Sequence, residues 1–423
     1  MRLPLLLRAL ALLSAVALPA AAPAQDLRGH GGPVRALAVT AEGRHAISGS
    51  FDTSAILWSL ADGSALAVMR FHEGSVNAVA ALPDGRLVTA GEDGRVIFWS
   101  ADGQDLVHAT RVHGAPIVGL VASADGATLA TAAWDGEARL LDARDGRTLR
   151  TLLGHKGNVN AVAFLPEGRV ATAGYDGDVL IHEPSGPARR VETGSPLNSM
   201  VALPDGRLAA GGAGGQVFFI DPAEGALTDL QAAEAPIIAL AAAPDGRTIA
   251  AAGPRGGVAI IDTGERRLKF TLNGPGLPVW SLAFSPDGRT LYSGGGDKLV
   301  RRWDARTGDH LGSLLPERPP SDLAGLGDSR GAEVFKACAV CHTLRPDDGA
   351  RAGPTLHGVF GRRAGTAAGY NYSEAFRKLD IVWTPETVSK LFEVGPQTYT
   401  PGTKMPEQTV GDAADRAALV DFL

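Results

Sequence analysis

Short runs in which apolar and polar residues alternate recur along most of the chain, as in residues 159–164. Turn residues separate these runs, and Pro-Asp-Gly occupies such a place at 204–206 and at 286–288. Alternation with a period of two predicts strands that turn one face toward a core. We therefore expect residues 34–304 to form a long series of short strands joined by tight turns.

The strand pattern itself repeats. Each unit begins with a β-branched residue or Leu and continues through four short strands before the next unit begins. Four strands in about 40 residues is typical of a propeller blade. A single blade cannot bury both of its faces, so the units must stack around an axis. We predict an all-β, seven-bladed propeller over residues 25–316. The units begin, at steps of 38 to 42 residues, at Val34, Val76, Ile117, Val159, Leu197, Ile237 and Val279.

Polar residues recur at fixed places in these units and resemble those of the WD-repeat family. In that family a His, a Ser or Thr, an Asp and a Trp of each blade form a polar network. The set is complete in units one and two, lacks the Trp in three and four, is lost in five and six, and is partly present in seven. The residues are His30, Ser48, Asp52 and Trp58; His72, Thr89, Asp93 and Trp99; His113, Thr131 and Asp135; His155, Thr172 and Asp176; Gly214 and Arg255 in place of Asp; and Asp297 with Trp303.

We interpret the repeat histidines as structural hydrogen-bonding residues, because they recur at a fixed place without a second ligand at metal-like spacing. Metal binding or catalysis is the alternative. His45, His108, His182 and His310 lie outside the pattern. Two segments could supply the fourth strand of the last blade: residues 26–28, or residues 310–315. We favour residues 310–315, because the first segment is short.

The first 24 residues have the pattern of a secretory signal peptide. Arg2 and Arg8 come first, residues 9–18 are apolar, and small residues stand at 22 and 24. A short membrane anchor is the alternative, but the apolar stretch is too short to span a bilayer. We expect a periplasmic or otherwise exported protein, soluble after cleavage and without a stable membrane span. A net charge of -6 argues against a nucleic-acid partner.

The two cysteines of the chain belong to one motif, Cys338-Ala-Val-Cys341-His342. This spacing is the attachment signal for c-type haem, in which two thiols bond covalently to the porphyrin and the His binds the iron. The alternatives are a redox-active cysteine pair, a zinc site and a simple disulfide. The first lacks a βαβ context, the second lacks further ligands, and the third leaves His342 unexplained.

Residues 328–423 resemble a class I cytochrome c of the mitochondrial type, a small all-α domain joined to the propeller by a linker over residues 317–327. The resemblance rests on residues 331–335, the haem motif, 353–358, 369–373, Trp383 and 401–405. It implies one covalent haem c with His342 and Met405 as iron ligands. Met405 is also the only Met of this domain, and His357 is its rival. Supporting contacts implied by the resemblance involve Pro354, Arg362, Tyr372, Trp383 and Thr403.

Two departures from the family stand out. A Tyr often precedes the Met loop, but Leu391 or Phe392 stands there, and the lysine-rich face is reduced to Arg351, Arg363, Lys390 and Lys404.

Two functions arise as hypotheses. The first is an electron carrier whose propeller docks a partner protein; its redox donor and acceptor stay unknown. The second is an oxidoreductase in which the propeller holds a catalytic site fed by the cytochrome domain. No second haem motif or His cluster is present in the sequence, so we favour the carrier.

Overall fold

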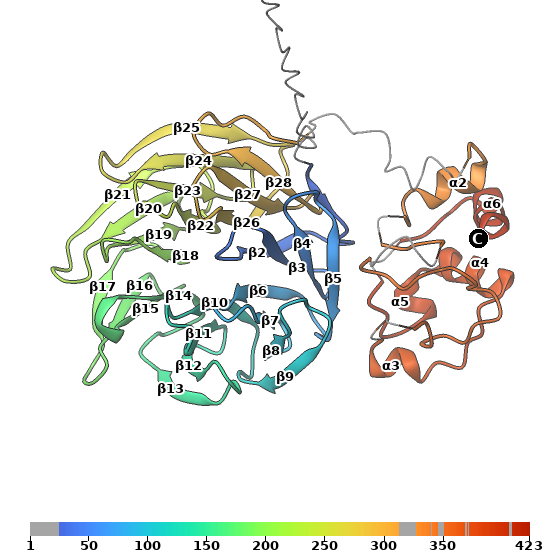
Figure 1. The fold of residues 1–423 in the computed structure, drawn as a ribbon, viewed down its shortest axis with the longest axis horizontal. Helices are drawn as coiled ribbons and strands as arrows, with labels where there is room; N and C mark the ends of the chain where they lie inside the picture. The colour runs from blue at the N-terminus through green and yellow to red at the C-terminus, as the bar shows by residue number, and fades with distance from the viewer. Residues whose placement is uncertain are drawn as a thin grey trace, which may run out of the picture.

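The computed structural model describes residues 25–312, 327–339, 341–345, 351–368, 370, 372–405 and 408–423. The predicted signal peptide, residues 313–316 and all of the predicted linker except Gly327 lie outside these ranges. Residues 25–312 form seven four-stranded antiparallel sheets, which are arranged as blades around a common axis (Figure 1). The predicted seven-bladed propeller is therefore confirmed.

Six blades follow one another along the chain, each built from four consecutive strands. Blades 1 to 3 are β2 (Val34–Val39), β3 (His45–Ser50), β4 (Ser54–Ser59) and β5 (Ala65–Arg70); β6 (Val76–Ala81), β7 (Leu87–Gly91), β8 (Arg95–Trp99) and β9 (Leu106–Arg111); and β10 (Ile117–Ala122), β11 (Thr128–Ala133), β12 (Ala138–Asp142) and β13 (Thr148–Leu152). Blades 4 to 6 are β14 (Val159–Phe164), β15 (Val170–Gly174), β16 (Asp178–His182) and β17 (Arg189–Glu192); β18 (Leu197–Ala202), β19 (Leu208–Gly212), β20 (Gln216–Ile220) and β21 (Leu227–Gln231); and β22 (Ala239–Ala242), β23 (Thr248–Ala252), β24 (Gly257–Asp262) and β25 (Arg267–Asn273). A short 3-10 turn, Pro166–Gly168, precedes β15.

The core lies between neighbouring blades. One cluster joins Ala90 and Phe98 of blade 2 to Leu129 and Leu141 of blade 3, and all four side chains are fully buried. Small residues such as Ala90 stand on the second strand of each blade, where facing sheets approach closely. Burial of this kind between stacked sheets stabilises each blade mainly through its neighbours.

The seventh blade corrects one expectation. It consists of β26 (Val279–Phe284), β27 (Thr290–Gly295), β28 (Leu299–Asp304) and β1 (Leu27–Arg28), which comes from the N-terminal side. Our preference for residues 310–315 is wrong: His310 makes only an isolated bridge with Trp303, and residues 313–315 lie outside the described ranges.

Two contacts allow the short strand β1 to complete blade 7. Leu27 is 1% exposed and packs with Trp58 and Val300 between blades 7 and 1. The Asp26 carboxylate lies 3.0 Å from Nε2 of His310, so the segment after blade 7 fastens the closing strand instead of replacing it. His310 also packs edge-on against Trp303.

The polar networks predicted in the first four blades are present. In blade 1, His30 contacts Asp52 at 3.0 Å and Ser48 at 2.8 Å, and the Trp58 indole donates to Ser48 at 2.7 Å. Burial opposes ionisation of Asp52, but His30 and the Ser54 hydrogen bonds outweigh it and lower its pKa to about 2. The equivalent contacts in blades 2 to 4 join His72 to Asp93 and Thr89, His113 to Asp135 and Thr131, and His155 to Asp176 and Thr172.

The C-terminal domain is helical. Its helices are α2 (Arg330–Phe335), α3 (Glu374–Arg377), α4 (Pro385–Val394), α5 (Pro396–Tyr399) and α6 (Ala413–Phe422). Side chains of Ser329, Thr384 and Asp412 accept hydrogen bonds from free backbone N–H groups at the starts of α2, α4 and α6. No helix in the part of the chain that the structure describes is long and apolar enough to cross a membrane.

Helices α2 and α6 cross closely and frame the domain. A Cβ added to Gly331 would collide with the Ala418 carbonyl, so only glycine permits this approach. Phe335 of α2 lies 5.5 Å from Phe422 of α6, measured between ring centroids. Helices α2 and α6 are therefore in direct contact through Gly331 and through this aromatic pair.

Candidate haem-binding site

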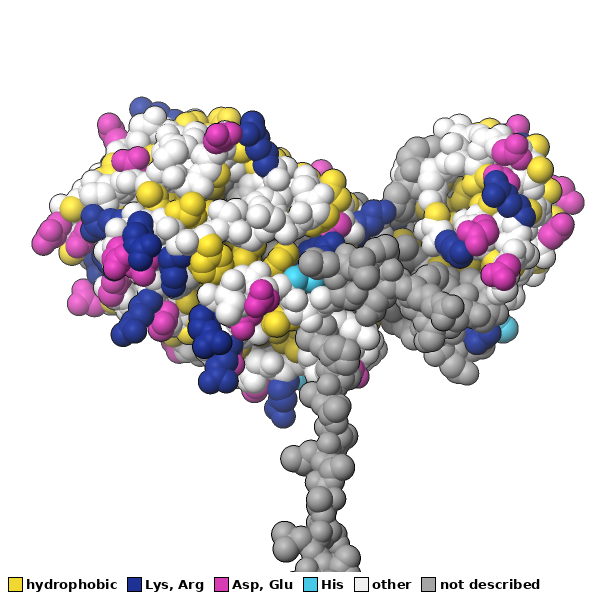
Figure 2. All heavy atoms as spheres, turned by 90° about the horizontal axis from the view of Figure 1, so that it is seen from above, with side chains coloured by type: hydrophobic (Ala, Val, Ile, Leu, Met, Phe, Trp, Pro, Cys, Tyr) yellow, Lys and Arg dark blue, Asp and Glu magenta, His cyan; other side chains and the backbone are white. Residues whose placement is uncertain are grey.

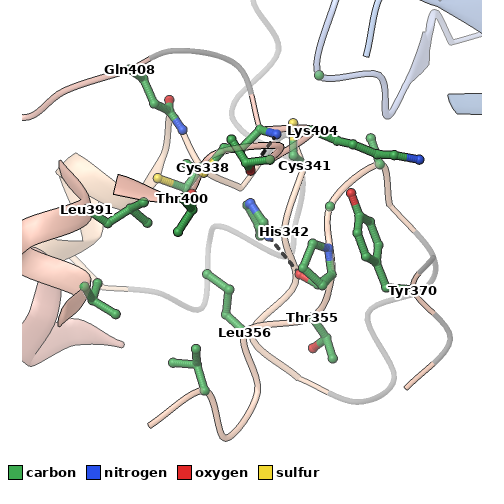
Figure 3. Close-up of a pocket in the computed structure, with 18 of the residues that line it drawn as sticks. Cys338, Cys341, His342, Thr355, Leu356, Tyr370, Leu391, Thr400, Lys404 and Gln408 are labelled. Atoms are coloured by element: carbon green, nitrogen blue, oxygen red, sulfur yellow. Dashed lines mark hydrogen bonds between the residues drawn. The ribbon is translucent and has the colours of Figure 1, made fainter. Parts of the chain in front are cut away.

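One cavity in the C-terminal domain brings together the residues of the Cys338-x-x-Cys341-His342 motif (Figure 3). The motif follows α2 as a tight turn, in which the backbone N–H groups of Cys341 and His342 both donate to the Cys338 carbonyl at 3.0 Å. This turn aims both sulfur atoms and the imidazole at the same space. Neither cysteine forms a disulfide.

His342 is held in one orientation. Its Nδ1 lies 2.8 Å from the Pro354 carbonyl oxygen, so Nδ1 carries the proton and donates it (Figure 3). Burial lowers the pKa of His342, although the Pro354 hydrogen bond opposes this, and the ring is therefore neutral. A neutral imidazole whose Nδ1 is occupied presents Nε2 as its metal-binding atom. Gly353 packs against the ring, where an added Cβ would lie 2.5 Å from Cε1.

The two thiols differ from those of a redox-active cysteine pair. Burial raises the pKa of Cys338 to about 11 and that of Cys341 to about 12. Catalytic thiols of disulfide oxidoreductases have lowered pKa values, since the thiolate is the nucleophile. The protein environment of these cysteines therefore favours a buried, protonated pair over a reactive one.

All nine residues that the sequence pointed to line this cavity: Cys338, Cys341, His342, Pro354, Arg362, Tyr372, Trp383, Thr403 and Met405. The backbone N–H of Met405 donates to Oγ1 of Thr403 at 3.1 Å, which fixes the approach of the Met loop. The loop is also held by Ser373, whose hydroxyl donates to the Gly402 carbonyl at 2.5 Å. His357, the rival ligand, is exposed and does not line the cavity.

Two further polar residues of the cavity, Arg362 and Tyr372, are held by neighbours. Arg362 donates to the Thr355 carbonyl at 2.9 Å, and its backbone pairs with that of Trp383. Tyr372 stacks on Phe376 with 5.1 Å between ring centroids, and burial raises the pKa of its hydroxyl. Contacts of these side chains with haem propionates stay predictions.

The two departures from the family have a structural context. Leu391 and Phe392 are both buried on α4 and both line the cavity, so apolar side chains fill the place of the usual Tyr. The four candidate basic residues are all engaged by other groups of the chain. Arg363 pairs with Asp380, Lys390 with Glu393, Arg351 donates to the Ala339 carbonyl, and Lys404 donates to the carbonyl of His72 in the propeller.

Sequence reasoning missed the propeller's share in this site. Gly31, Asp52 and Lys298 line the same cavity as the haem motif, although they belong to blades 1 and 7 and the loops beside them. Tyr370 also lines it, within a stretch that the sequence had matched only as a whole. No local pattern marks a contact between segments so far apart along the chain, so the sequence carried no signal for it.

The residues present fit a covalently bound haem. Two unpaired thiols, a neutral imidazole with Nε2 available and a thioether sulfur converge on a cavity whose other walls include Leu356, Val388 and Leu419. These are the attachment groups and axial ligands of a c-type haem in an apolar surround.

Comparisons with known proteins agree with both halves of this arrangement. The WD domain, G-beta repeat, matches residues 22–59, 63–100, 146–183 and 266–304. Each match takes in the outer strand of one blade and the first three strands of the next, which is blade 1, 2, 4 or 7. The cytochrome c family matches residues 329–423. Cytochrome c of Arabidopsis thaliana is 42% identical over 105 residues, covering 24% of this chain and 93% of that protein. Cytochrome c of Cochliobolus lunatus is 43% identical over 99 residues, covering 23% and 91%.

Fold and site together define a WD-repeat propeller joined to a c-type haem domain. Through that C-terminal domain the chain belongs to the cytochrome c family. A cytochrome c domain implies electron transfer by a covalently bound haem, and therefore redox partners, while WD repeats imply interaction with proteins.

Proposed function

We propose that this protein is an exported one-electron carrier with a single haem c, ligated by His342 and Met405, whose propeller is a scaffold for docking a partner. One observation carries the proposal. Cys338, Cys341, His342 and Met405 line a single cavity, and the Nδ1 proton of His342 is bound by the Pro354 carbonyl.

Each residue has a definite task in this proposal. Cys338 and Cys341 fix the cofactor covalently, His342 binds one side of the iron and Met405 the other. A haem bound in this way takes up and releases one electron without an open coordination position. Pro354 holds the imidazole in its ligating tautomer. The apolar wall formed by Val388, Leu391 and Phe392 excludes water. Little solvent therefore has to reorient when the haem gains or loses an electron.

Two features support the remaining parts of the proposal. The signal-like pattern of residues 1–24 supports export, and covalent haem attachment suits a compartment outside the cytoplasm. The outer side of the propeller, seen in Figure 2, offers a large surface for protein contact, on which basic and acidic side chains are interspersed. A partner of mixed surface charge fits such a face better than a strongly charged one.

An absorption spectrum and an elemental analysis test the proposal. The exported protein is purified, its oxidised and reduced spectra are recorded, and iron and other metals are counted per chain. We expect one iron, a low-spin c-type spectrum and the far-red band of Met-ligated ferric haem. A high-spin spectrum would exclude closed His/Met ligation. A second metal per chain would exclude the simple carrier and point to a catalytic site in the propeller.

A further inference from the structure

The C-terminal domain meets the propeller at the edge of blades 1 and 2, beside β5 (Figure 1). Nε of Arg70 donates to the Ala352 carbonyl at 3.0 Å, and the Arg70 guanidinium lies over the Tyr370 ring, 4.8 Å from its centroid. Nζ of Lys404 donates to the His72 carbonyl at 2.8 Å. We call Gly31, Asp52, Arg70 and His72 the blade 1 rim. Every cytochrome residue in these contacts belongs to the haem cavity or directly adjoins a residue lining it.

Gly31 shows how tightly this contact closes. The residue that follows the network His is Gly31 in blade 1 and Glu73, Gly114 and Lys156 in blades 2 to 4. It is exposed in blades 2 to 4 but buried in blade 1. The position accepts side chains as large as Lys, yet a Cβ on Gly31 would collide with Sγ of Cys341, whereas one on Gly114 would meet no atom within 4 Å.

Arg70 has a matched counterpart as well. Arg70 ends β5 and pairs with Ser54, and Arg111 ends β9 of the next blade and pairs with Arg95 in the same register. Arg111 is exposed and donates to the carbonyl of His113, in the propeller loop that directly follows it, at 3.4 Å. Arg70 is half-buried and turns outward to the cytochrome domain. Of these two equivalent arginines, only Arg70 of blade 1 takes part in the interface with the cytochrome domain.

We propose that the blade 1 rim is the docking surface for the Cys341 side of the haem cavity in the chain's own cytochrome domain. Docking closes this side against external redox proteins, which exchange electrons there only after the domain separates from the rim. The inference rests on the proposed function, because it assumes that Cys341 carries the haem. It adds that the propeller's first partner is the cytochrome domain of the same chain.

The closing effect follows from the position of Cys341. Its sulfur lies against Gly31, so a haem bonded to this sulfur would have the propeller backbone beside that bond. An incoming protein cannot occupy the same space. If only the separated form reacts, the observed rate constant equals the intrinsic one multiplied by the separated fraction.

The experiment compares full-length holoprotein with Gly31→Leu and Arg70→Ala, and with the matched controls Gly114→Leu and Arg111→Ala. Two quantities are measured: the radius of gyration from small-angle X-ray scattering, and the rate constant for oxidation of the reduced protein by azurin, a small blue-copper protein. We expect Gly31→Leu and Arg70→Ala to enlarge the radius and to raise the rate constant about tenfold. Both controls should match the wild type in both quantities.

The scattering measurement separates this inference from the proposed function, since it does not depend on the iron ligands. Low-spin spectra with an unchanged radius in both rim variants would overturn the inference and leave the carrier intact. An enlarged radius with an unchanged rate constant would show that the rim does not close the reacting edge. An equal response of the Gly114→Leu control would also overturn it. A mass that doubles with concentration in the wild type would assign the rim to a second copy's cytochrome domain.

Discussion

In blade 4, Nε2 of His182 lies 3.0 Å from Oγ1 of Thr172, the hydroxyl that His155 also contacts at 2.8 Å. Blades 1, 2 and 7 place a Trp indole N–H in this position, on Ser48, Thr89 and Ser293. His182 therefore replaces the missing Trp of blade 4 and completes its network with a smaller ring. A histidine that looked irregular in the sequence belongs to the repeat.

This replacement predicts acid sensitivity. Burial is the largest cause that lowers the pKa of His182, to about 4, followed by repulsion from His155. Between about pH 6.5 and pH 4, His182 is protonated in the unfolded chain but neutral in the folded chain. The free energy of unfolding therefore falls as pH falls through this window. We expect a loss of about 1–2 kcal/mol from this group. Guanidinium unfolding at about pH 4.5 and 7.5 should show a smaller pH effect in His182→Gln than in the wild type.

The control for this measurement is His45→Gln, which changes a histidine at the start of β3 that is only half-buried. Its pH effect should equal that of the wild type. Equal pH effects in the wild type and His182→Gln would show that His182 is not the group responsible.

Replacement of Met405 should change the spectrum without releasing the haem. In Met405→Ala we expect the far-red band to disappear and the reduction potential to fall by on the order of 0.1 V, because a thioether ligand favours reduced iron. Met200→Leu is the control, since Met200 is buried in blade 5 and does not line the cavity. Persistence of the band in Met405→Ala would assign the second ligand to another residue.

The two thiols should each suffice for covalent attachment. Mass spectrometry of denatured protein should show one haem on the wild type and on Cys338→Ser. The double variant Cys338→Ser, Cys341→Ser should carry none, because no thiol is left to form a thioether. A haem mass on the denatured double variant would disprove attachment through this motif.

Leu27 is the buried apolar contact of the strand that closes the ring. Leu27→Ala should lower the free energy of unfolding by about 2–4 kcal/mol, because it opens a cavity between blades 7 and 1. Arg28→Ala, a change at the exposed neighbour on the same strand, should have an effect under about 0.5 kcal/mol. The midpoint of thermal unfolding checks both variants. Similar losses in the two would mean that strand pairing, rather than Leu27, holds the blade.

Features that repeat, or that have a fixed spacing, could be predicted from the sequence. The period of about 40 residues predicted seven blades, and the motif at 338–342 with the Met405 loop predicted the residues that line one cavity. The sequence did not predict that β1 closes the ring, because two residues carry too little pattern to outweigh a longer apolar segment. Nor could it place Gly31 against Cys341, because this contact depends on how two separately folded units meet.

Closure by β1 also has a consequence for the order of folding. Leu27 pairs with Val300, so the strand made first finds its partner only after six complete blades have been made. Contacts between residues so far apart in sequence form slowly, because the entropy of closing a long loop is lost before the contacts can stabilise the fold. Until then blade 7 lacks its outer strand, and blades 1 and 7 keep apolar faces uncovered. The propeller is therefore completed late, when β1 pairs with β28. Until then the stretch around Leu27 has no strand to pair with.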